Sequence, residues 1–169
     1  MMTDGWDKTY WNKSDCEFII KNFIENKNIC SYENENRKYK RFILLEKYKD
    51  FGFHWVWDNL DYLIKNNLGD NYYLSTWVIG LKYTEGDYFL EHQDDYGNKK
   101  DRLLSGGIEL SDSSDYVGGD YIVEGKSLKA KQGFLFTHSP SILHEITEIK
   151  KGTRYSLHFC ISKKSGQIL

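Results

Sequence analysis

Residues 14–28 have the hydrophobic periodicity of an amphipathic helix. Their apolar side chains recur at spacings of up to about five residues and would share one face: Cys16, Phe18, Ile19 and Phe23. Ser14 begins this run and Glu17 follows three residues later, which is the pattern of a capping box. The segment therefore predicts a helix with Ser14 as its N-cap.

A strand and a second helix are predicted in the rest of the first seventy residues. Residues 41–48 (RFILLEKY) form a short apolar run typical of a strand. Residues 56–69 (VWDNLDYLIKNNLG) return to helical spacing, and Gly69 stands where such a helix would stop. The apolar face of this helix would be Leu60, Leu63 and Ile64.

From Tyr72 onward the pattern shortens to strand-like runs separated by clusters of Gly, Asp and Ser. The runs are residues 72–83, 87–92, 102–110, 120–125, 133–138 and 154–162. Many short strands with such punctuation are typical of a β sandwich or barrel. No repeat or linker divides the chain. We therefore expect a single domain over residues 1–169, mainly β with flanking helices: a helical part at about 1–70 and a β barrel at about 71–163.

Composition supports this interpretation and limits the function. A chain of 169 residues suits one domain, and thirteen Tyr, nine Phe and five Trp favour pleated, half-buried surfaces. The formal net charge of −2 provides no overall field for nucleic acid or an anionic membrane. The basic segment 36–41 (NRKYKR) could contact phosphates locally, but a solvated strand edge is the favoured interpretation.

The cysteines and the N-terminal segment indicate the compartment. Cys16, Cys30 and Cys160 are odd in number and widely spaced, so they predict neither a disulfide framework nor a zinc site. The first residues lack the basic and apolar regions of a secretory signal, and no apolar run reaches membrane-spanning length. We therefore expect a soluble, intracellular protein in the reducing cytoplasm.

Candidate metal ligands follow the predicted strand 87–92. The sequence EHQDD places His92 and Asp94 one residue apart, which by itself is also consistent with an exposed polar loop. His144 lies in the same β-rich half of the chain. Two histidines and one carboxylate form the facial triad of non-heme iron(II) oxygenases, which leaves positions open for cosubstrate and dioxygen. His92, Asp94 and His144 are therefore candidate iron ligands.

Arg154 is the candidate for binding an anion beside that metal. It lies ten residues after His144 in a predicted strand, and Ser156 shares its face because the side-chain period of a strand is two. Arginine binds a carboxylate through two parallel hydrogen bonds, so a dicarboxylate cosubstrate would suit it. The alternative is a structural arginine paired with an acidic neighbour.

These motifs resemble the iron(II) and 2-oxoglutarate-dependent oxygenases, specifically the prolyl 4-hydroxylase-like branch. The resemblance runs from about residue 83 to 161. It rests on Tyr83, Gly86, His92, Asp94, Ser111, Gly118, Gly119, Gly133, Leu135, Phe136, His144, Gly152, Arg154, Tyr155, Ser156 and Leu157. Ser111 stands where the family has asparagine.

The resemblance implies a double-stranded β-helix, a jelly-roll or cupin-like barrel with N-terminal helices. It implies that His92, Asp94 and His144 hold iron(II), and that Arg154 binds the far carboxylate of 2-oxoglutarate with the help of Tyr83 and Ser156. At the position of Glu109 some members carry a tyrosine that contacts the same carboxylate. A glutamate there would repel the cosubstrate unless it turns away or pairs with a cation. His54, His138 and His158 are expected to be packed or hydrogen-bonded histidines and are assigned no role. His158 would share the face of Arg154 in a regular strand, so lining the cavity is the alternative for that residue.

The expected activity is hydroxylation of a peptidyl residue, with proline as the first candidate, coupled to conversion of 2-oxoglutarate to succinate with ascorbate as reductant. Hydroxylation of a small molecule such as a free amino acid is an alternative, and a non-catalytic jelly-roll binding module is another. We expect no membrane partner. A nucleic acid substrate is disfavoured, because the second arginine expected after Arg154 in that branch is absent.

Overall fold

The computed structural model describes residues 8–9, 11–24, 30–45, 54–94, 102–128 and 130–164. Its two helices are α1 (Lys13–Ile24) and α2 (His54–Leu68). Its strands are β1 (Lys8–Thr9), β2 (Cys30–Asn34), β3 (Arg37–Leu45), β4 (Tyr72–Thr84), β5 (Tyr88–His92), β6 (Arg102–Glu109), β7 (Tyr116–Gly118), β8 (Tyr121–Val123), β9 (Lys126–Leu128), β10 (Phe134–His138), β11 (His144–Ile146) and β12 (Ile149–Lys163).

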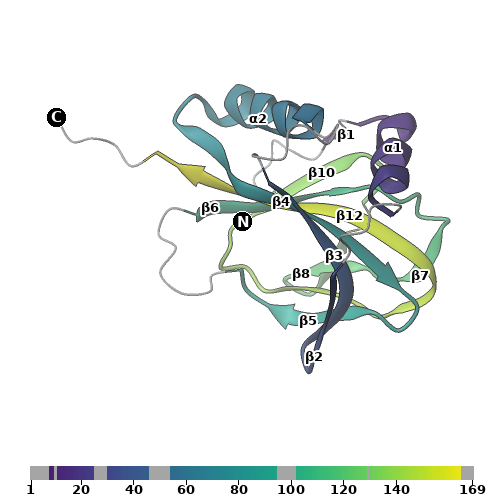
Figure 1. Ribbon diagram of the computed structural model, residues 1–169. Coiled ribbons are helices and arrows are strands. Elements are labelled where there is room, and N and C mark those ends of the chain that lie inside the picture. The colour runs from purple at the N-terminus through teal and green to yellow at the C-terminus, as the bar shows by residue number, and fades with distance from the viewer. Residues whose placement is uncertain are drawn as a thin grey trace.

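The strands pair antiparallel in the order β1-β10-β6-β12-β4-β3-β5-β11-β8-β9, with β2 on β3 and β7 on β12. This order curls into two layers (Figure 1). One layer contains β10, β6, β12 and β4, and the helices lie on its outer side. The other contains β5, β11 and β8 and lies on the opposite side of the first layer. The arrangement is the double-stranded β-helix that the sequence analysis expected.

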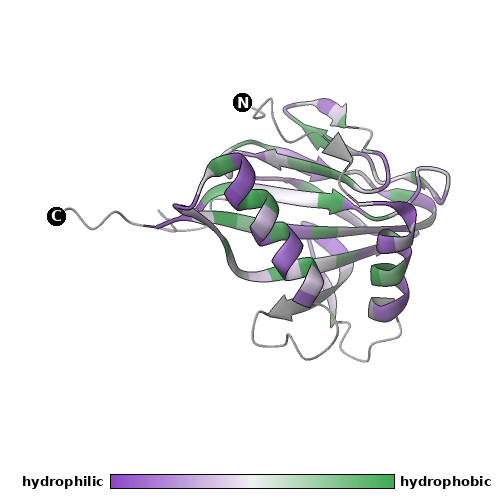
Figure 2. Ribbon diagram, turned by 90° about the horizontal axis from the view of Figure 1, so that it is seen from above, coloured by the Kyte–Doolittle hydropathy of each residue, from purple (hydrophilic) through white to green (hydrophobic). Residues whose placement is uncertain are grey.

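Two hydrophobic cores lie on the two faces of the first layer. The outer core joins the helices to the layer through Cys16, Ile19, Leu60, Ile64, Val78, Ile108, Phe159 and Ile161. The inner core lies between the layers and is rich in tyrosine: Tyr39, Tyr83, Tyr121, Phe136, Ile146 and Ile149. In Figure 2, α2 lies across the strands and carries both hydrophilic and hydrophobic residues, as expected of a helix with one buried face.

Helix α1 begins two residues earlier than predicted, and its N-cap is Asn12 rather than Ser14. The Asn12 side chain accepts a hydrogen bond from the backbone N–H of Asp15 at 3.0 Å. The Asp15 carboxylate accepts one from the N–H of Asn12 at 3.3 Å. This is a reciprocal capping box, so the motif was recognised at the wrong residues. Residues 25–28 of the predicted helix lie outside the described part of the chain.

Helix α2 agrees with its prediction. Leu60, Leu63 and Ile64 are buried on one face. Gly69 follows the helix with a φ of 100° and donates its N–H to the carbonyl of Lys65 at 2.8 Å, which is how a glycine ends a helix. Neither helix in the described part of the chain has the length and apolar character needed to cross a membrane.

The strand predicted at 41–48 begins earlier, because the basic segment 36–41 forms the turn after β2 and the start of β3. Residues 46–48 lie outside the described part. β2 was not predicted, because its sequence CSYEN is mostly polar and its residues other than Tyr32 are exposed. The remaining predicted strands correspond to β4, β5, β6, β8, β10 and β12.

Candidate metal centre and cavity

The three predicted metal ligands meet where two neighbouring strands pair. His92 is the last residue of β5 and His144 the first of β11, and these two residues are directly opposite each other in the antiparallel ladder. Asp94 follows two residues after His92. Its Oδ1 lies 3.8 Å from Nε2 of His92 and 3.7 Å from Nε2 of His144. One ligand atom of each residue lies within 4.8 Å of the others, a grouping that could hold a metal ion.

Backbone carbonyls orient both imidazole rings. Nδ1 of His92 lies 2.9 Å from the carbonyl of Leu90, and Nδ1 of His144 lies 2.9 Å from the carbonyl of Ile142. A carbonyl can only accept, so each Nδ1 carries the hydrogen and each Nε2 presents its lone pair toward Asp94. Oδ2 of Asp94 is buried without a hydrogen-bond partner among the described residues. The donor set fits iron(II) in a facial triad.

The local electrostatics favour the protonation state that binds a metal. Burial, with a contribution from His144, lowers the pKa of His92 to about 4. Burial alone would raise the pKa of Asp94, but His158 and His144 outweigh it and lower that pKa to about 2. A neutral His92 imidazole and an ionised Asp94 carboxylate are therefore present at neutral pH, and neither group has to lose a proton before a metal binds.

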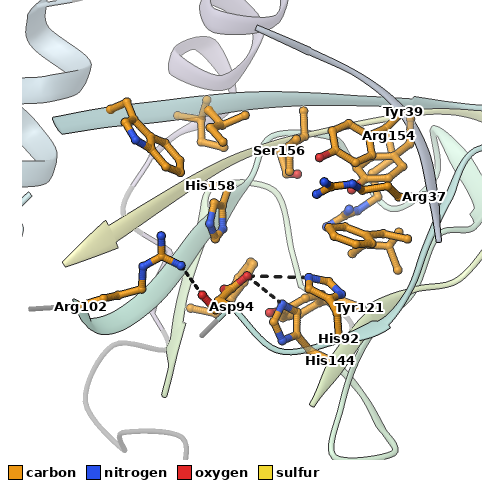
Figure 3. A pocket seen from close by; sticks show the side chains of 18 residues that line it. Arg37, Tyr39, His92, Asp94, Arg102, Tyr121, His144, Arg154, Ser156 and His158 are labelled. Carbon is orange, nitrogen blue, oxygen red and sulfur yellow. Dashed lines mark hydrogen bonds and ion pairs between the residues drawn. The ribbon is translucent and has the colours of Figure 1, made fainter. Parts of the chain in front are cut away.

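The triad opens into a cavity of about 200 Å³ between the two layers (Figure 3). β12 forms one wall through alternate residues: Arg154, Ser156 and His158 face the cavity. Phe159 and Ile161, on the other face of the strand, pack in the outer core. The two-residue period that placed Arg154 and Ser156 on one face is thus confirmed.

Arg154 is paired with the glutamate that the sequence analysis found out of place. Its Nε donates to Oε2 of Glu109 at 2.9 Å, and its Nη2 lies 2.7 Å from the same oxygen. Both side chains are almost fully buried, at 2% and 1% exposure. Burial raises the pKa of Glu109 above its ordinary value, and Arg154 opposes that rise. A second cavity of about 310 Å³ also borders both residues.

Two hydrogen-bond donors remain unused at this end of the first cavity. Nη1 of Arg154 and the hydroxyl of Tyr83 are buried without a partner among the described residues. The Arg154 guanidinium lies 5.8 Å from the centre of the Tyr83 ring. Ser156 lines the same cavity. A bound carboxylate would satisfy these donors, so the residues present fit the far end of 2-oxoglutarate.

Three further polar residues line the cavity. His158 lies beside Arg154 and Ser156, which is the alternative that the two-residue period left open for it, whereas Arg102 and Arg37 were not predicted as part of the site. Arg102 donates to the backbone carbonyl of Asp94 at 2.6 Å and so fixes the loop that carries this ligand. Arg37 enters from β3. It belongs to the basic segment predicted as a solvated edge, and nothing local to its sequence indicates a cavity.

Of the two other histidines, His138 is packed and hydrogen-bonded as expected, whereas His54 is exposed. His138 is buried, with Nε2 2.6 Å from the Tyr121 hydroxyl and Nδ1 2.8 Å from the carbonyl of Ser139. Its ring centre lies 4.5 Å from that of His144, so it supports the ligand without being one. His54 is an exposed residue at the start of α2.

No protein-family model matches the chain, and no curated protein matches it in sequence. Solved structures do match it in fold. A viral collagen prolyl hydroxylase from Paramecium bursaria Chlorella virus-1, in complex with 2-oxoglutarate, has a TM-score of 0.69 at 16% identity and covers 98% of this chain and 96% of its own. A prolyl-4-hydroxylase from Pseudomonas putida has a TM-score of 0.68 at 15% identity, covering 98% and 92%.

A third similar structure is a prolyl hydroxylase from Trichoplax adhaerens in complex with a peptide fragment of the hypoxia inducible factor oxygen degradation domain. Its TM-score is 0.71 at 15% identity, and the match covers 93% of this chain and 81% of that one. At sequence identities this low, the structural likeness establishes the fold alone. The chain therefore has the double-stranded β-helix fold of prolyl hydroxylases and other 2-oxoglutarate and iron(II) oxygenases.

Proposed function

We propose that the chain is an iron(II)- and 2-oxoglutarate-dependent dioxygenase that hydroxylates a peptidyl residue, with proline as the first candidate. The observation that carries the proposal is the triad of His92, Asp94 and His144 at one end of a cavity with two unsatisfied donors at the other. A structural metal site would be expected to close its coordination sphere with a fourth protein ligand. In the described residues this grouping has three.

Each part of the cavity has a role in this proposal. His92, Asp94 and His144 hold iron(II). Arg154 and Tyr83 receive the far carboxylate of 2-oxoglutarate through Nη1 and the phenolic hydroxyl, and Ser156 lies beside them. When bound, iron(II) would supply the redox chemistry by which dioxygen, the oxidant, gives one oxygen atom to the substrate hydroxyl and the other to succinate, with carbon dioxide released from 2-oxoglutarate.

The surrounding residues hold this arrangement in place. Arg102 fixes the Asp94 backbone, and the stacking of Phe89 on His92, with ring centres 3.6 Å apart, restricts that imidazole. Apolar side chains such as Phe136 and Leu157 line much of the remaining wall and exclude water. A site in which ligand rotamers are locked by neighbours is preorganised for binding.

The peptidyl substrate is supported by the neighbours in fold. All three are prolyl hydroxylases by description; one is named a collagen prolyl hydroxylase, and another is in complex with a peptide fragment. The substrate part of the proposal rests on that likeness. The metal and cosubstrate parts rest on this chain's own residues.

Succinate formation tests the proposal. The purified protein with iron(II), ascorbate and 2-oxoglutarate should release succinate slowly, and faster when the substrate is added. Proline-rich peptides and free amino acids should be compared as substrates, since faster turnover with free amino acids alone would favour a small-molecule hydroxylase. His144→Ala should abolish turnover. The matched control His54→Ala, on the exposed start of α2, should not.

Cosubstrate binding separates an enzyme from a binding module. Calorimetry on the protein loaded with Mn(II), which does not turn over, should detect 2-oxoglutarate. Absence of binding would contradict the proposal and favour a jelly-roll module that keeps its metal face for structure.

A further inference from the structure

Three arginines line the cavity, and they differ in their partners. Arg154 is paired with Glu109, and Arg102 donates to a backbone carbonyl. Arg37 is held by aromatic rings. Its guanidinium lies 4.2 Å from the centre of the Tyr32 ring and 5.2 Å from that of Phe89, and it donates to the Tyr32 hydroxyl at 2.9 Å. Within the described ranges, no carboxylate forms an ion pair with Arg37.

Arg37 lies at the same end of the cavity as Arg154. Both residues line the cavity with Tyr83. Burial raises the pKa of Tyr83, and the charges of Arg154 and Arg37 both oppose that rise. Figure 3 shows Arg37 and Arg154 at one end and Arg102 at the other. Arg37 is half-buried, and the rings of Tyr32 and Phe89 fix the direction of its side chain because each ring face attracts the guanidinium.

The two ends of the cavity differ in the net positive charge that they would offer to a carboxylate of 2-oxoglutarate. Iron(II) with one aspartate carries one positive charge, which one carboxylate of the 2-oxoglutarate dianion neutralises. At the far end the Glu109 carboxylate already neutralises Arg154. The second carboxylate would therefore enter a buried site without a counter-charge, which is costly in a low-dielectric interior, unless another cation is present.

We infer that Arg37 supplies the positive charge that balances the far carboxylate of 2-oxoglutarate, an inference that rests on the proposed function. Arg154 and Tyr83 then act as positioning hydrogen-bond donors. The charge comes from a different strand, β3, rather than from β12. The positive charge and the hydrogen-bond donors must come from different residues, because Glu109 neutralises the charge of Arg154.

Calorimetric binding of 2-oxoglutarate to the Mn(II)-loaded protein tests this role. Arg37→Gln should weaken binding about tenfold or more, the effect expected for loss of a charged partner. Arg37→Lys should retain much of the affinity, since it keeps the charge. The matched control is Lys38→Gln, which removes the same charge from the next residue of β3, a residue that is not among those lining the cavity.

A second comparison tests the link to Glu109. In a Glu109→Gln background Arg154 recovers its net charge, so adding Arg37→Gln should weaken binding by a smaller factor than it does in the wild type. Thermal unfolding of each variant shows which proteins are folded. If Glu109→Gln does not fold, the comparison of Arg37→Gln with Arg37→Lys still decides whether charge at this position matters.

The possible outcomes are distinct. Wild-type affinity in Arg37→Gln would overturn the inference, as would an equal loss in both backgrounds or a loss in Lys38→Gln of the same size. Failure of the wild type itself to bind 2-oxoglutarate would overturn the proposed function instead. A selective loss in Arg37→Gln, reduced in the Glu109→Gln background, supports the inference.

Discussion

Arg154 uses Nε and Nη2 on Glu109 and keeps Nη1 without a hydrogen-bond partner among the described residues. Under the proposed function, one side chain would combine a structural ion pair with a ligand-binding donor, two roles that the sequence analysis treated as alternatives. Removing one partner of a buried pair leaves an uncompensated charge and typically costs about 3–5 kcal/mol. Stability and binding are therefore coupled at this residue.

Arg154→Lys should lower both the stability of the protein and its affinity for 2-oxoglutarate. Lysine keeps the charge but cannot hold Glu109 and also present a donor in the direction of Nη1, because it lacks the planar fork. We expect a lower melting temperature and 2-oxoglutarate binding weakened by about tenfold or more in the Mn(II)-loaded protein, measured by calorimetry. A destabilised protein with normal 2-oxoglutarate affinity would show that Nη1 has no part in binding.

The cysteines provide a second prediction for single residues. Cys16 and Cys160 are buried and Cys30 is exposed, all as free thiols. Burial raises the pKa of Cys16 to about 12, so almost none of it is thiolate at neutral pH. A disulfide-exchange reagent should therefore modify Cys30 rapidly in the native protein, and all three thiols only after denaturation. Rapid modification of the Cys16 thiol in the native protein would contradict its burial.

At the scale of elements, strand β12 and helix α1 were predicted from different features of the sequence. β12 separates the outer core from the cavity, so its alternate residues must differ in polarity, and the sequence shows that alternation directly. Helix α1 has its buried face correctly indicated by Cys16 and Ile19, but Phe18 is 45% exposed. Its start depends on which of several polar residues forms the cap.

Asn12→Ala should destabilise the protein by about 1 kcal/mol, because Asn12 is the N-cap of α1. Ser14→Ala is the matched control at the residue the sequence suggested, and it should cost less, since the Ser14 hydroxyl bonds only the Asn12 side chain among the described contacts. Urea unfolding of both variants measures the difference. Equal losses, or a larger one for Ser14→Ala, would contradict the cap seen here.

At the scale of the whole molecule, the site lies between two layers whose interior excludes water. Burial is the largest cause of the lowered pKa of His92 and of His138, each to about 4. The metal-free protein therefore holds neutral imidazoles that an unfolded chain would protonate near 6.5. The fold and its acid stability are linked through these groups.

The metal-free protein should lose stability as the pH falls from about 6.5 toward 4. In this range the unfolded chain takes up protons on His92 and His138 while the folded chain does not, so the equilibrium shifts toward unfolding. Urea unfolding at several pH values measures the slope. A flat stability profile over this pH range would contradict the burial of the His92 and His138 rings.

The sequence by itself determined the parts of this protein that depend on local pattern. The two-residue period placed Arg154 and Ser156 on one face, and the spacing of His92, Asp94 and His144 indicated the metal centre. Gly69 marked the end of α2 because a left-handed residue there favours glycine. The face of Arg154 and Ser156, the His92–Asp94 pair and the helix stop at Gly69 are each contained in a few neighbouring residues, whereas His144 was added because its residue type completes the ligand set.

The tertiary structure decided how distant segments meet. Glu109 and Arg154 are 45 residues apart and pair because β6 lies beside β12. Arg37 reaches the cavity because β3 inserts between β4 and β5, bringing it opposite Phe89 in the ladder. Strand order follows from the burial of whole faces against one another rather than from local pattern. The counter-charges within the cavity, and hence the cation available to a second carboxylate, could therefore not be predicted before the strands were assembled.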